Sequence, residues 1–276
     1  MHHHHSKREH VTVPLLRRES IGHLYHVLTF DMPDAPPAAA GQFLMIRGAE
    51  WGEAPLLPRP MSYLSGGNTP SVLIKVCGEG TIRLGRSEPG EPFTLLGPLG
   101  NPWRAEQADR TQILVAGGVG VAPLLFLARD LVARRRNPLF IYGARTENDL
   151  PLHDDITRIC DLMIATEDGS RGWRGLVTDA LEHVLRDDCE IYTCGPEPMM
   201  ARVAAIAAER GVPCSASLET PMACGYGVCL GCPVPVVEGG YLYACTDGPC
   251  VDARRVDWSH ARKAPHNRTP SERNAP

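Results

Sequence analysis

The chain has 276 residues and a net charge of −4, which excludes the strongly basic surface that nucleic-acid partners usually require. With 43% hydrophobic and 22% charged residues, the composition is that of a soluble globular protein and excludes a disordered or fibrous one. The longest apolar run, residues 113–128, is interrupted by Gly117, Gly118, Gly120 and Pro123, so we expect no membrane span.

The first ten residues hold a histidine run, His2–His5, followed by charged residues and no apolar core. We interpret residues 1–10 as a tag-like or disordered segment and not as a signal peptide. The chain has ten cysteines, and without an export signal such cysteines are more often metal ligands or redox groups than disulfides. The sequence therefore predicts a cytoplasmic protein with a metal or redox site.

Residues 11–105 contain short β-rich runs, such as residues 23–30 and 71–77, which turn-forming clusters separate. Closely spaced short strands are typical of an antiparallel barrel or sandwich. Within this part, Arg59-Pro60-Met61-Ser62 offers a fixed guanidinium that can hold a phosphate. Gly80-Thr81 is a glycine–hydroxyl pair suited to a pyrophosphate.

Strands and helices alternate between residues 106 and 213. This alternation predicts a parallel sheet with helices on both faces. The predicted strands are residues 111–117, 138–144, 161–168 and 189–196, and the predicted helices are residues 121–136, 152–159, 176–185 and 197–211.

Two glycine motifs follow strands of this predicted sheet. Gly117, Gly118 and Gly120 lie between a strand and a helix whose first turn holds Pro123. Such a turn brings helix N–H groups up to a pyrophosphate, although an ordinary tight strand–helix turn has the same composition. The second motif, Cys194-Gly195-Pro196, follows a later strand. Since ligands of open α/β sheets bind outside the carboxyl ends of the strands, both motifs are predicted to face one nucleotide-binding crevice.

A third strand end carries acidic residues. Asp168, with Glu167 before it, is suited to accept ribose hydroxyls and would repel the 2′-phosphate of NADP. Arg145 and Arg171 would instead favour NADP, because they can pair with its 2′-phosphate. We therefore expect NAD rather than NADP to bind.

Residues 214–251 form a loop-rich module that carries the cysteine cluster. Cys224, Cys229, Cys232 and Cys245 have the spacing C-x4-C-x2-C-x12-C, and the first three match a plant-type [2Fe–2S] site. The intervening glycines let backbone N–H groups approach the sulfurs. A zinc site held by the same four cysteines is the alternative.

The remaining cysteines are assigned other roles. Cys250 competes with Cys245 for the fourth position, and Cys245 is favoured because it directly follows a predicted return strand at residues 239–244. Four scattered cysteines are expected to be core thiols: Cys77, Cys160, Cys189 and Cys214. The tail, residues 252–276, holds six Arg/Lys and three Asp/Glu and is expected to be solvated.

Taken in order, these motifs resemble the ferredoxin–NADP reductase superfamily, in which a barrel binds flavin and a following α/β domain binds nicotinamide. Met61 departs from the tyrosine that many members place against the flavin. With the cysteine cluster added, residues 11–251 are similar to the electron-transfer subunits of type B dihydroorotate dehydrogenase. The resemblance implies an FAD-binding barrel at residues 11–105, an NAD-binding domain at 106–213 and a [2Fe–2S] module at 214–251.

The resemblance also implies residue roles and a partner. FAD would contact Arg59 to Ser62, Gly80-Thr81, and the segment Leu73, Ile74 and Lys75. Ser62 would lie near the flavin N5. Glu219, just before the cluster, either lines the nicotinamide pocket or is an ordinary solvated glutamate. The four cysteines would hold the cluster. The partner would be a catalytic subunit that carries FMN, in a heterotetramer of two copies each.

The expected activity is electron transfer between NAD(H) and the partner's FMN during orotate synthesis, with no acid or base residue named. Flavin exchanges both hydride and single electrons, so it is required between nicotinamide and the cluster. The same modules serve sulfhydrogenase, anaerobic sulfite reductase and bifurcating transhydrogenase subunits. A free-standing diaphorase and a redox-sensing or zinc-stabilised module without catalysis are further alternatives.

Overall fold

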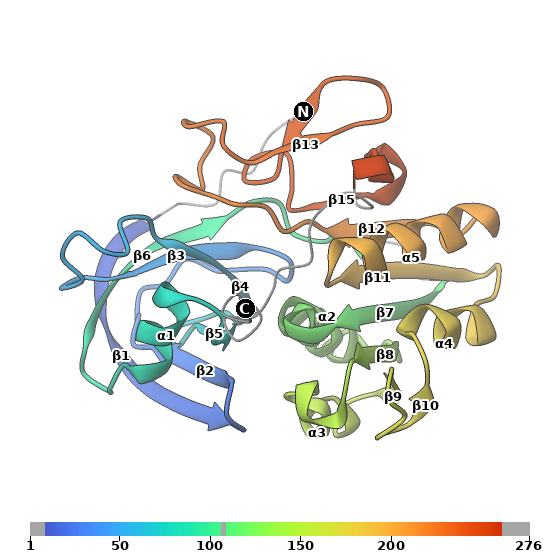
Figure 1. Ribbon diagram of the computed structural model, residues 1–276, viewed down its shortest axis with the longest axis horizontal. Helices are drawn as coiled ribbons and strands as arrows, with labels where there is room; N and C mark the ends of the chain where they lie inside the picture. Colours follow the sequence, from blue (N-terminus) through green and yellow to red (C-terminus); the bar gives the residue numbers. More distant parts are fainter. Residues whose placement is uncertain (1–8, 106–108, 261–276) are drawn as a thin grey trace, which may run out of the picture.

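The computed structural model describes residues 9–105 and 109–260, and Figure 1 shows three parts. A barrel comes first along the chain, an α/β sheet second, and a small C-terminal module lies above both in this view. The histidine run and most of the predicted solvated tail lie outside the described residues. Within the described residues, no helix combines the length and the apolar character needed to cross a membrane.

The first part is a closed antiparallel barrel with the strand order β1-β2-β5-β4-β3-β6, which confirms the predicted barrel. The long strand β1 pairs with β6 through its first half and with β2 through its second, and a bulge lies between Leu15 and Arg17. Inside the barrel, Phe30 and Phe93 pack edge to face with ring centroids 5.6 Å apart. The strands are β1 (Glu9–Ile21), β2 (Tyr25–Phe30), β3 (Phe43–Gly48), β4 (Arg59–Ser65), β5 (Ser71–Lys75) and β6 (Pro92–Leu99).

The sequence analysis missed one helix, α1 (Glu79–Arg86), which lies between β5 and β6. The Thr81 hydroxyl accepts hydrogen bonds from the N–H groups of Cys77 and Gly78 at 2.9 and 3.0 Å and so fixes the turn that starts the helix. Leu84 is its one large side chain that is fully buried. A short helix with one such anchor leaves little apolar periodicity in the sequence.

The second part is a seven-stranded sheet with the order β10-β9-β8-β7-β11-β12-β15, parallel except for β15. Helices α2 and α3 pack on one face and α4 and α5 on the other, which confirms the predicted α/β layers. The strands are β7 (Thr111–Gly117), β8 (Leu139–Ala144), β9 (Asp161–Thr166), β10 (Trp173–Arg174), β11 (Cys189–Cys194), β12 (Cys214–Ser217) and β15 (Cys250–Asp252). The helices are α2 (Val121–Ala133), α3 (His153–Thr157), α4 (Val177–Val184) and α5 (Glu197–Glu209).

The predicted boundary after residue 213 falls inside this sheet. Strand β12 pairs in parallel with β11, and β15 pairs antiparallel with β12. The C-terminal module therefore leaves the sheet after Ser217 and returns to it at Cys250. Between these points lies a hairpin of β13 (Pro233–Pro235) and β14 (Tyr241–Tyr243). Two 3-10 turns, η3 (Ala253–Arg255) and η4 (Trp258–His260), follow β15.

The predicted core thiols divide into three groups. Cys189 and Cys214 are buried, as expected, and Cys160 is half-buried. Cys77 is exposed, so the prediction for it is wrong. The reason is that Cys77 lies just beyond the end of β5, in the turn that starts α1.

The Phe30–Phe93 contact predicts a large effect of truncation. Phe30 is 0% exposed, and Phe30→Ala is expected to lower the free energy of unfolding by about 3–5 kcal/mol, because the cavity would not close fully. Leu16 is 49% exposed, so Leu16→Ala is the matched control with an expected change below about 0.5 kcal/mol. Guanidinium unfolding followed by far-UV circular dichroism measures both, and equal losses would contradict a packed barrel core.

Candidate functional site

The two glycine motifs meet at the point where the strand order of the sheet reverses. Strand β7 has β8 on one side and β11 on the other, so the carboxyl ends of β7 and β11 flank a switch-point crevice. A Cβ at Gly120 would lie 2.2 Å from the Cys194 carbonyl oxygen, and a Cβ at Gly117 would lie 2.8 Å from Pro196 Cδ. Only glycine permits this contact, so the structure brings the two predicted motifs together.

The crevice also collects the N-termini of two long helices. The 3-10 turn η1 (Gly118–Gly120) leads directly into α2, whose first turn contains Pro123, and α5 begins directly after Pro196. Helix N-termini present free N–H groups and the positive end of the macrodipole. This arrangement suits a pyrophosphate between the two motifs.

Asp168 is fully exposed at the end of β9, where its carboxylate stabilises its own turn. Its Oδ1 accepts hydrogen bonds from the Ser170 hydroxyl at 2.7 Å and the Ser170 N–H at 2.9 Å. These bonds lower the pKa of Asp168. The Ser170 hydroxyl in turn accepts a hydrogen bond from the Glu147 N–H at 2.8 Å. The carboxylate is therefore charged and held in place, and its contact with a ribose remains a prediction.

On the barrel side, Arg59 lies across the start of α1. A Cβ at Gly80 would lie 3.0 Å from both Cδ and Nε of Arg59, so glycine is what allows the guanidinium to rest there. Arg59 Nη2 donates to the Leu57 carbonyl at 3.1 Å, while its Nε is buried without a partner. A buried orphan donor beside a helix N-terminus fits an anionic ligand such as a flavin pyrophosphate.

Several other residues predicted to contact the flavin already have partners within the protein. The Thr81 hydroxyl is already bonded within its own turn, and it also donates to the Gly78 carbonyl at 2.9 Å. Ile74 points into the barrel core, so only its backbone is free to face a ligand. Lys75 forms an ion pair with Asp149 of the α/β domain at 3.2 Å. Met61 and Ser62 are half-buried on β4.

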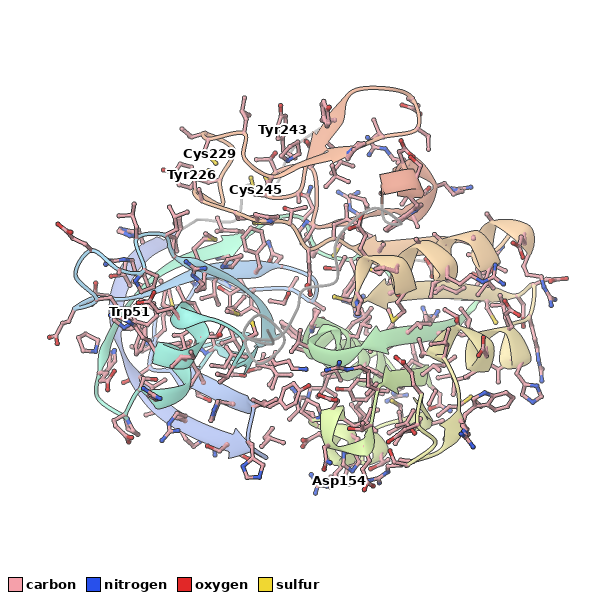
Figure 2. The ribbon with its side chains drawn as sticks, viewed as in Figure 1. Trp51, Asp154, Tyr226, Cys229, Tyr243 and Cys245 are labelled. Carbon is pink, nitrogen blue, oxygen red and sulfur yellow. The ribbon has the colours of Figure 1, made fainter. Side chains whose placement is uncertain are left out.

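The cluster loop brings its four cysteines together as two pairs of residues. The Cys229 N–H donates to Cys224 Sγ at 3.5 Å, while Cys232 Sγ and Cys245 Sγ are 3.3 Å apart. Figure 2 shows Cys229 and Cys245 in the C-terminal module above the barrel. Two pairs of cysteines are the arrangement that a [2Fe–2S] site requires, with two thiolates on each iron.

Backbone donors prepare this loop for thiolates. Burial alone would raise the pKa of Cys224, but N–H groups of Cys229, Tyr226 and Val228 outweigh it and lower the value to about 6. The opposite holds for Cys245, because burial and the Cys232 hydrogen bond raise its pKa to about 12. The loop backbone thus favours the thiolate form of Cys224 before any metal contributes.

Cys250 stands outside the cluster. Its sulfur donates weakly to the Gly41 carbonyl of the barrel at 3.6 Å. Cys245 Sγ lies beside Cys232 Sγ instead, and the choice of Cys245 over Cys250 for the fourth position remains a prediction.

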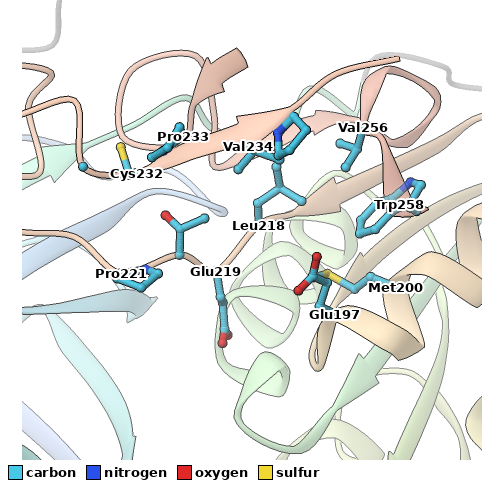
Figure 3. Close-up of a pocket in the computed structure, with 13 residues that line it drawn as sticks. Glu197, Met200, Leu218, Glu219, Pro221, Cys232, Pro233, Val234, Val256 and Trp258 are labelled. Atoms are coloured by element: carbon cyan, nitrogen blue, oxygen red, sulfur yellow. The ribbon is translucent and has the colours of Figure 1, made fainter. Parts of the chain in front are cut away.

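Two cavities flank the cluster loop, and the sequence analysis did not find them. The larger, about 550 Å³, lies between the loop and the barrel and is lined by Met45, Arg47, Leu57 and Cys224 among others. The smaller, about 230 Å³, lies between the start of α5 and Cys232 and is shown in Figure 3. No sequence pattern indicates either cavity, because the walls of each come from segments that are distant in the chain.

Glu219 lines the smaller cavity, but its carboxylate points away from Cys232 (Figure 3). Solvent reaches the side chain, although protein surrounds it on most sides, and this desolvation raises the pKa of the carboxyl. Its predicted place beside the nicotinamide remains a prediction.

Comparison with known proteins identifies the family. Residues 114–205 match the oxidoreductase NAD-binding domain, and residues 219–257 match the iron–sulfur cluster binding domain of dihydroorotate dehydrogenase B. The chain is 33% identical to the dihydroorotate dehydrogenase B (NAD(+)) electron transfer subunit of Desulforamulus reducens, over 84% of this chain and 92% of that protein. The chain belongs to this family. It is also 38% identical to the probable electron transfer subunit of Methanopyrus kandleri, over 76% and 77% of the two chains.

Solved structures support the fold of the chain. An NADH-dependent reduced ferredoxin–NADP oxidoreductase, studied for flavin-based electron bifurcation, superposes with a TM-score of 0.81 at 30% identity over 91% of both chains. A ferredoxin NADP+ reductase from Neisseria gonorrhoeae, with bound FAD and NADP, has a TM-score of 0.64 at 15% identity and covers 73% of this chain and 92% of its own. At that identity it supports the fold alone. The resemblance inferred from the motifs is confirmed.

The contact between the cluster loop and the barrel yields a prediction for this family member. Gly225 has φ +78°, and a Cβ there would lie 2.7 Å from Met45 Cγ, so Gly225→Ala is expected to lift the loop and reduce bound iron at least about twofold. Gly240 has φ +83° but no neighbour within 4 Å, so Gly240→Ala carries the same backbone strain without the collision. Iron per chain, measured on both purified variants, should fall only for Gly225→Ala. Equal iron contents would contradict the role of the contact.

Proposed function

We propose that the chain is the electron transfer subunit of an NAD+-dependent dihydroorotate dehydrogenase and acts in the cytoplasm during pyrimidine synthesis. It would pass electrons between a partner's FMN and NAD(H), so that oxidation of dihydroorotate to orotate reduces NAD+. Bound FAD supplies the conversion between hydride and single-electron transfer. All ten cysteines are free, which fits a reducing compartment.

The observation that best supports this proposal is that three candidate binding sites lie next to one another in one chain. The crevice at Gly120 and Cys194 fits NAD, and Arg59 on Gly80 fits the FAD pyrophosphate. The third site, the paired cysteines, lies against the barrel through Gly225 and Met45. In this proposal the glycine turn and helix ends bind phosphate, Arg59 orients the flavin nucleotide, and the cysteines hold two irons. Asp168 would select NAD by repelling a 2′-phosphate.

An exposed apolar surface supports a partner at the cluster. Tyr226, Val228 and Leu230 of the cluster loop are 44%, 73% and 54% exposed. Apolar side chains gathered around a redox site indicate a docking surface. We propose that the FMN-containing catalytic subunit covers this cluster-loop surface, in a heterotetramer of two copies each.

The first experiment is an anaerobic visible spectrum before and after NADH, with iron, zinc and flavin assayed on the same sample. We expect one FAD and two irons per chain, both bleached by NADH. Zinc in place of iron, or no flavin, would overturn the proposal.

A second experiment tests the cluster ligands. Cys232→Ser should lose most of the iron because it removes one thiolate, whereas Cys250→Ser, outside the cluster, should retain it.

The docking surface gives a separate prediction. Val228→Asp places a charge on the cluster-loop surface and is expected to weaken binding of the catalytic subunit at least about tenfold, which is roughly 1.4 kcal/mol. Val237, in the loop between β13 and β14, is 63% exposed, so Val237→Asp is the control. Titration calorimetry measures the affinity, and NADH-dependent ferricyanide reduction should be unchanged in both. Equal weakening by the two variants would contradict this docking face.

A second candidate is a subunit of a bifurcating transhydrogenase, which the 30% identity to the NADH-dependent reduced ferredoxin–NADP oxidoreductase favours. The two functions differ in their partner. Co-purification with a dihydroorotate dehydrogenase catalytic subunit and dihydroorotate-dependent NAD+ reduction would support the first. Stable assembly only with a ferredoxin- and NADP-reducing subunit would support the second.

A further inference from the structure

A three-residue contact joins the barrel to the α/β domain at one carboxylate. The Tyr25 hydroxyl donates to Asp149 Oδ1 at 2.8 Å, and Lys75 Nζ lies 3.2 Å from the same oxygen. Tyr25 and Lys75 are directly paired on β2 and β5, and the Lys75 ammonium lies 5.1 Å from the Tyr25 ring centroid. Asp149 belongs to the 3-10 turn η2 (Glu147–Asp149) after β8. Two neighbouring barrel strands therefore converge on one residue of the other domain.

The contact is shielded from solvent, and the protonation states of Tyr25 and Asp149 both favour it. Tyr25 is 2% exposed, and the Asp149 side chain is 19% exposed. Burial would raise the pKa of Asp149, but hydrogen bonds from Tyr25 and Lys75 outweigh it and lower the value, so the carboxylate is ionised. Burial together with Asp149 raises the pKa of Tyr25, so the hydroxyl keeps its proton. Of the ion pairs formed between described residues, this one alone joins the two domains.

The contact lies beside the glycine turn of the nucleotide crevice. Tyr142, fully buried on β8, donates to the Gly118 carbonyl at 3.0 Å, and its pKa is raised by burial, Tyr25 and Asp149. Strand β5, which carries Lys75, lies directly against η1. A movement at Asp149 would therefore shift the turn that faces the nucleotide relative to the barrel that faces the flavin.

We propose that Asp149 is a positioning residue for hydride transfer, which it serves by fixing the α/β domain on the barrel at the glycine turn. The inference rests on the proposed function, in which NAD and FAD are carried by different domains. Hydride donor and acceptor must approach to about 3–3.5 Å, and an error of about 1 Å can cost roughly 10²-fold in rate. The Lys75 side chain then serves the domain contact, and its backbone remains available to the flavin.

The test measures the limiting rate of flavin reduction by NADH in anaerobic stopped flow, together with flavin content and thermal midpoint. Asp149→Ala removes the acceptor for both barrel side chains and is expected to lower the limiting rate about tenfold or more, with FAD content unchanged. Asp149→Glu, which keeps the carboxylate, should restore part of the rate. A limiting rate of Asp149→Ala within twofold of the unaltered chain, even with a lower thermal midpoint, would overturn the proposal.

A second variant and a control keep the test decisive. If Asp149→Ala does not retain FAD, Tyr25→Phe keeps the buried ring and removes only the donor, with an expected drop of at least about threefold. An unchanged rate in Tyr25→Phe would then overturn the proposal. Arg129 also bridges the domains, through a hydrogen bond to the Leu64 carbonyl at 3.1 Å. It lies about 12 Å along α2 from Val121, the first residue of the helix after the glycine turn, and so serves as the control.

Arg129→Met should therefore leave the limiting rate nearly unchanged. A loss as large as that of Asp149→Ala would assign domain alignment to the whole interface and overturn the specific role of Asp149. If NADH does not reduce the flavin of the unaltered chain, it is the proposed function that fails.

Discussion

The close approach of Gly120 to the end of β11 is the constraint on which the nucleotide site depends. A Cβ at Gly120 would sit 2.2 Å from the Cys194 carbonyl oxygen, so the turn after β7 and the turn after β11 can touch only through glycine. This contact sets where α2 begins, since η1 leads straight into it. Because α2 also packs against β4 of the barrel, the same contact determines how the barrel meets the sheet.

The C-terminal module is held to both domains rather than appended to one of them. The Asn101 N–H donates to the Gly248 carbonyl at 2.6 Å, and Asn101 Nδ2 donates to the Thr246 carbonyl at 3.0 Å. These bonds tie the segment directly after Cys245 to the end of β6. Immediately beyond that segment, β15 joins the sheet beside β12. A cysteine of the cluster therefore has a fixed position relative to both the barrel and the crevice.

Sequence patterns predicted the features that local chemistry determines. The glycine turns and the cysteine spacing depend on residue types that few other structures require, and the alternation of strands and helices is a long periodic signal. Pairing between distant segments left no such signal. Strand β12 has only four residues, and its place in the sheet depends on hydrogen bonds to β11 and β15. The ion pair of Lys75 with Asp149 joins residues 74 positions apart, so the sequence analysis assigned Lys75 to the flavin alone.

The two sides of the cluster site differ in how far their cysteines are buried. Cys232 and Cys245 are each 2% exposed and pack in the core of the module, whereas Cys229 is exposed. A group held by all four would be shielded on the side of the second pair and open on the side of Cys229. That open side is also where Tyr226, Val228 and Leu230 present apolar surface. A partner that covers this side would both exclude water from the group and bring its own redox centre near, so affinity and electron transfer would depend on the same few side chains.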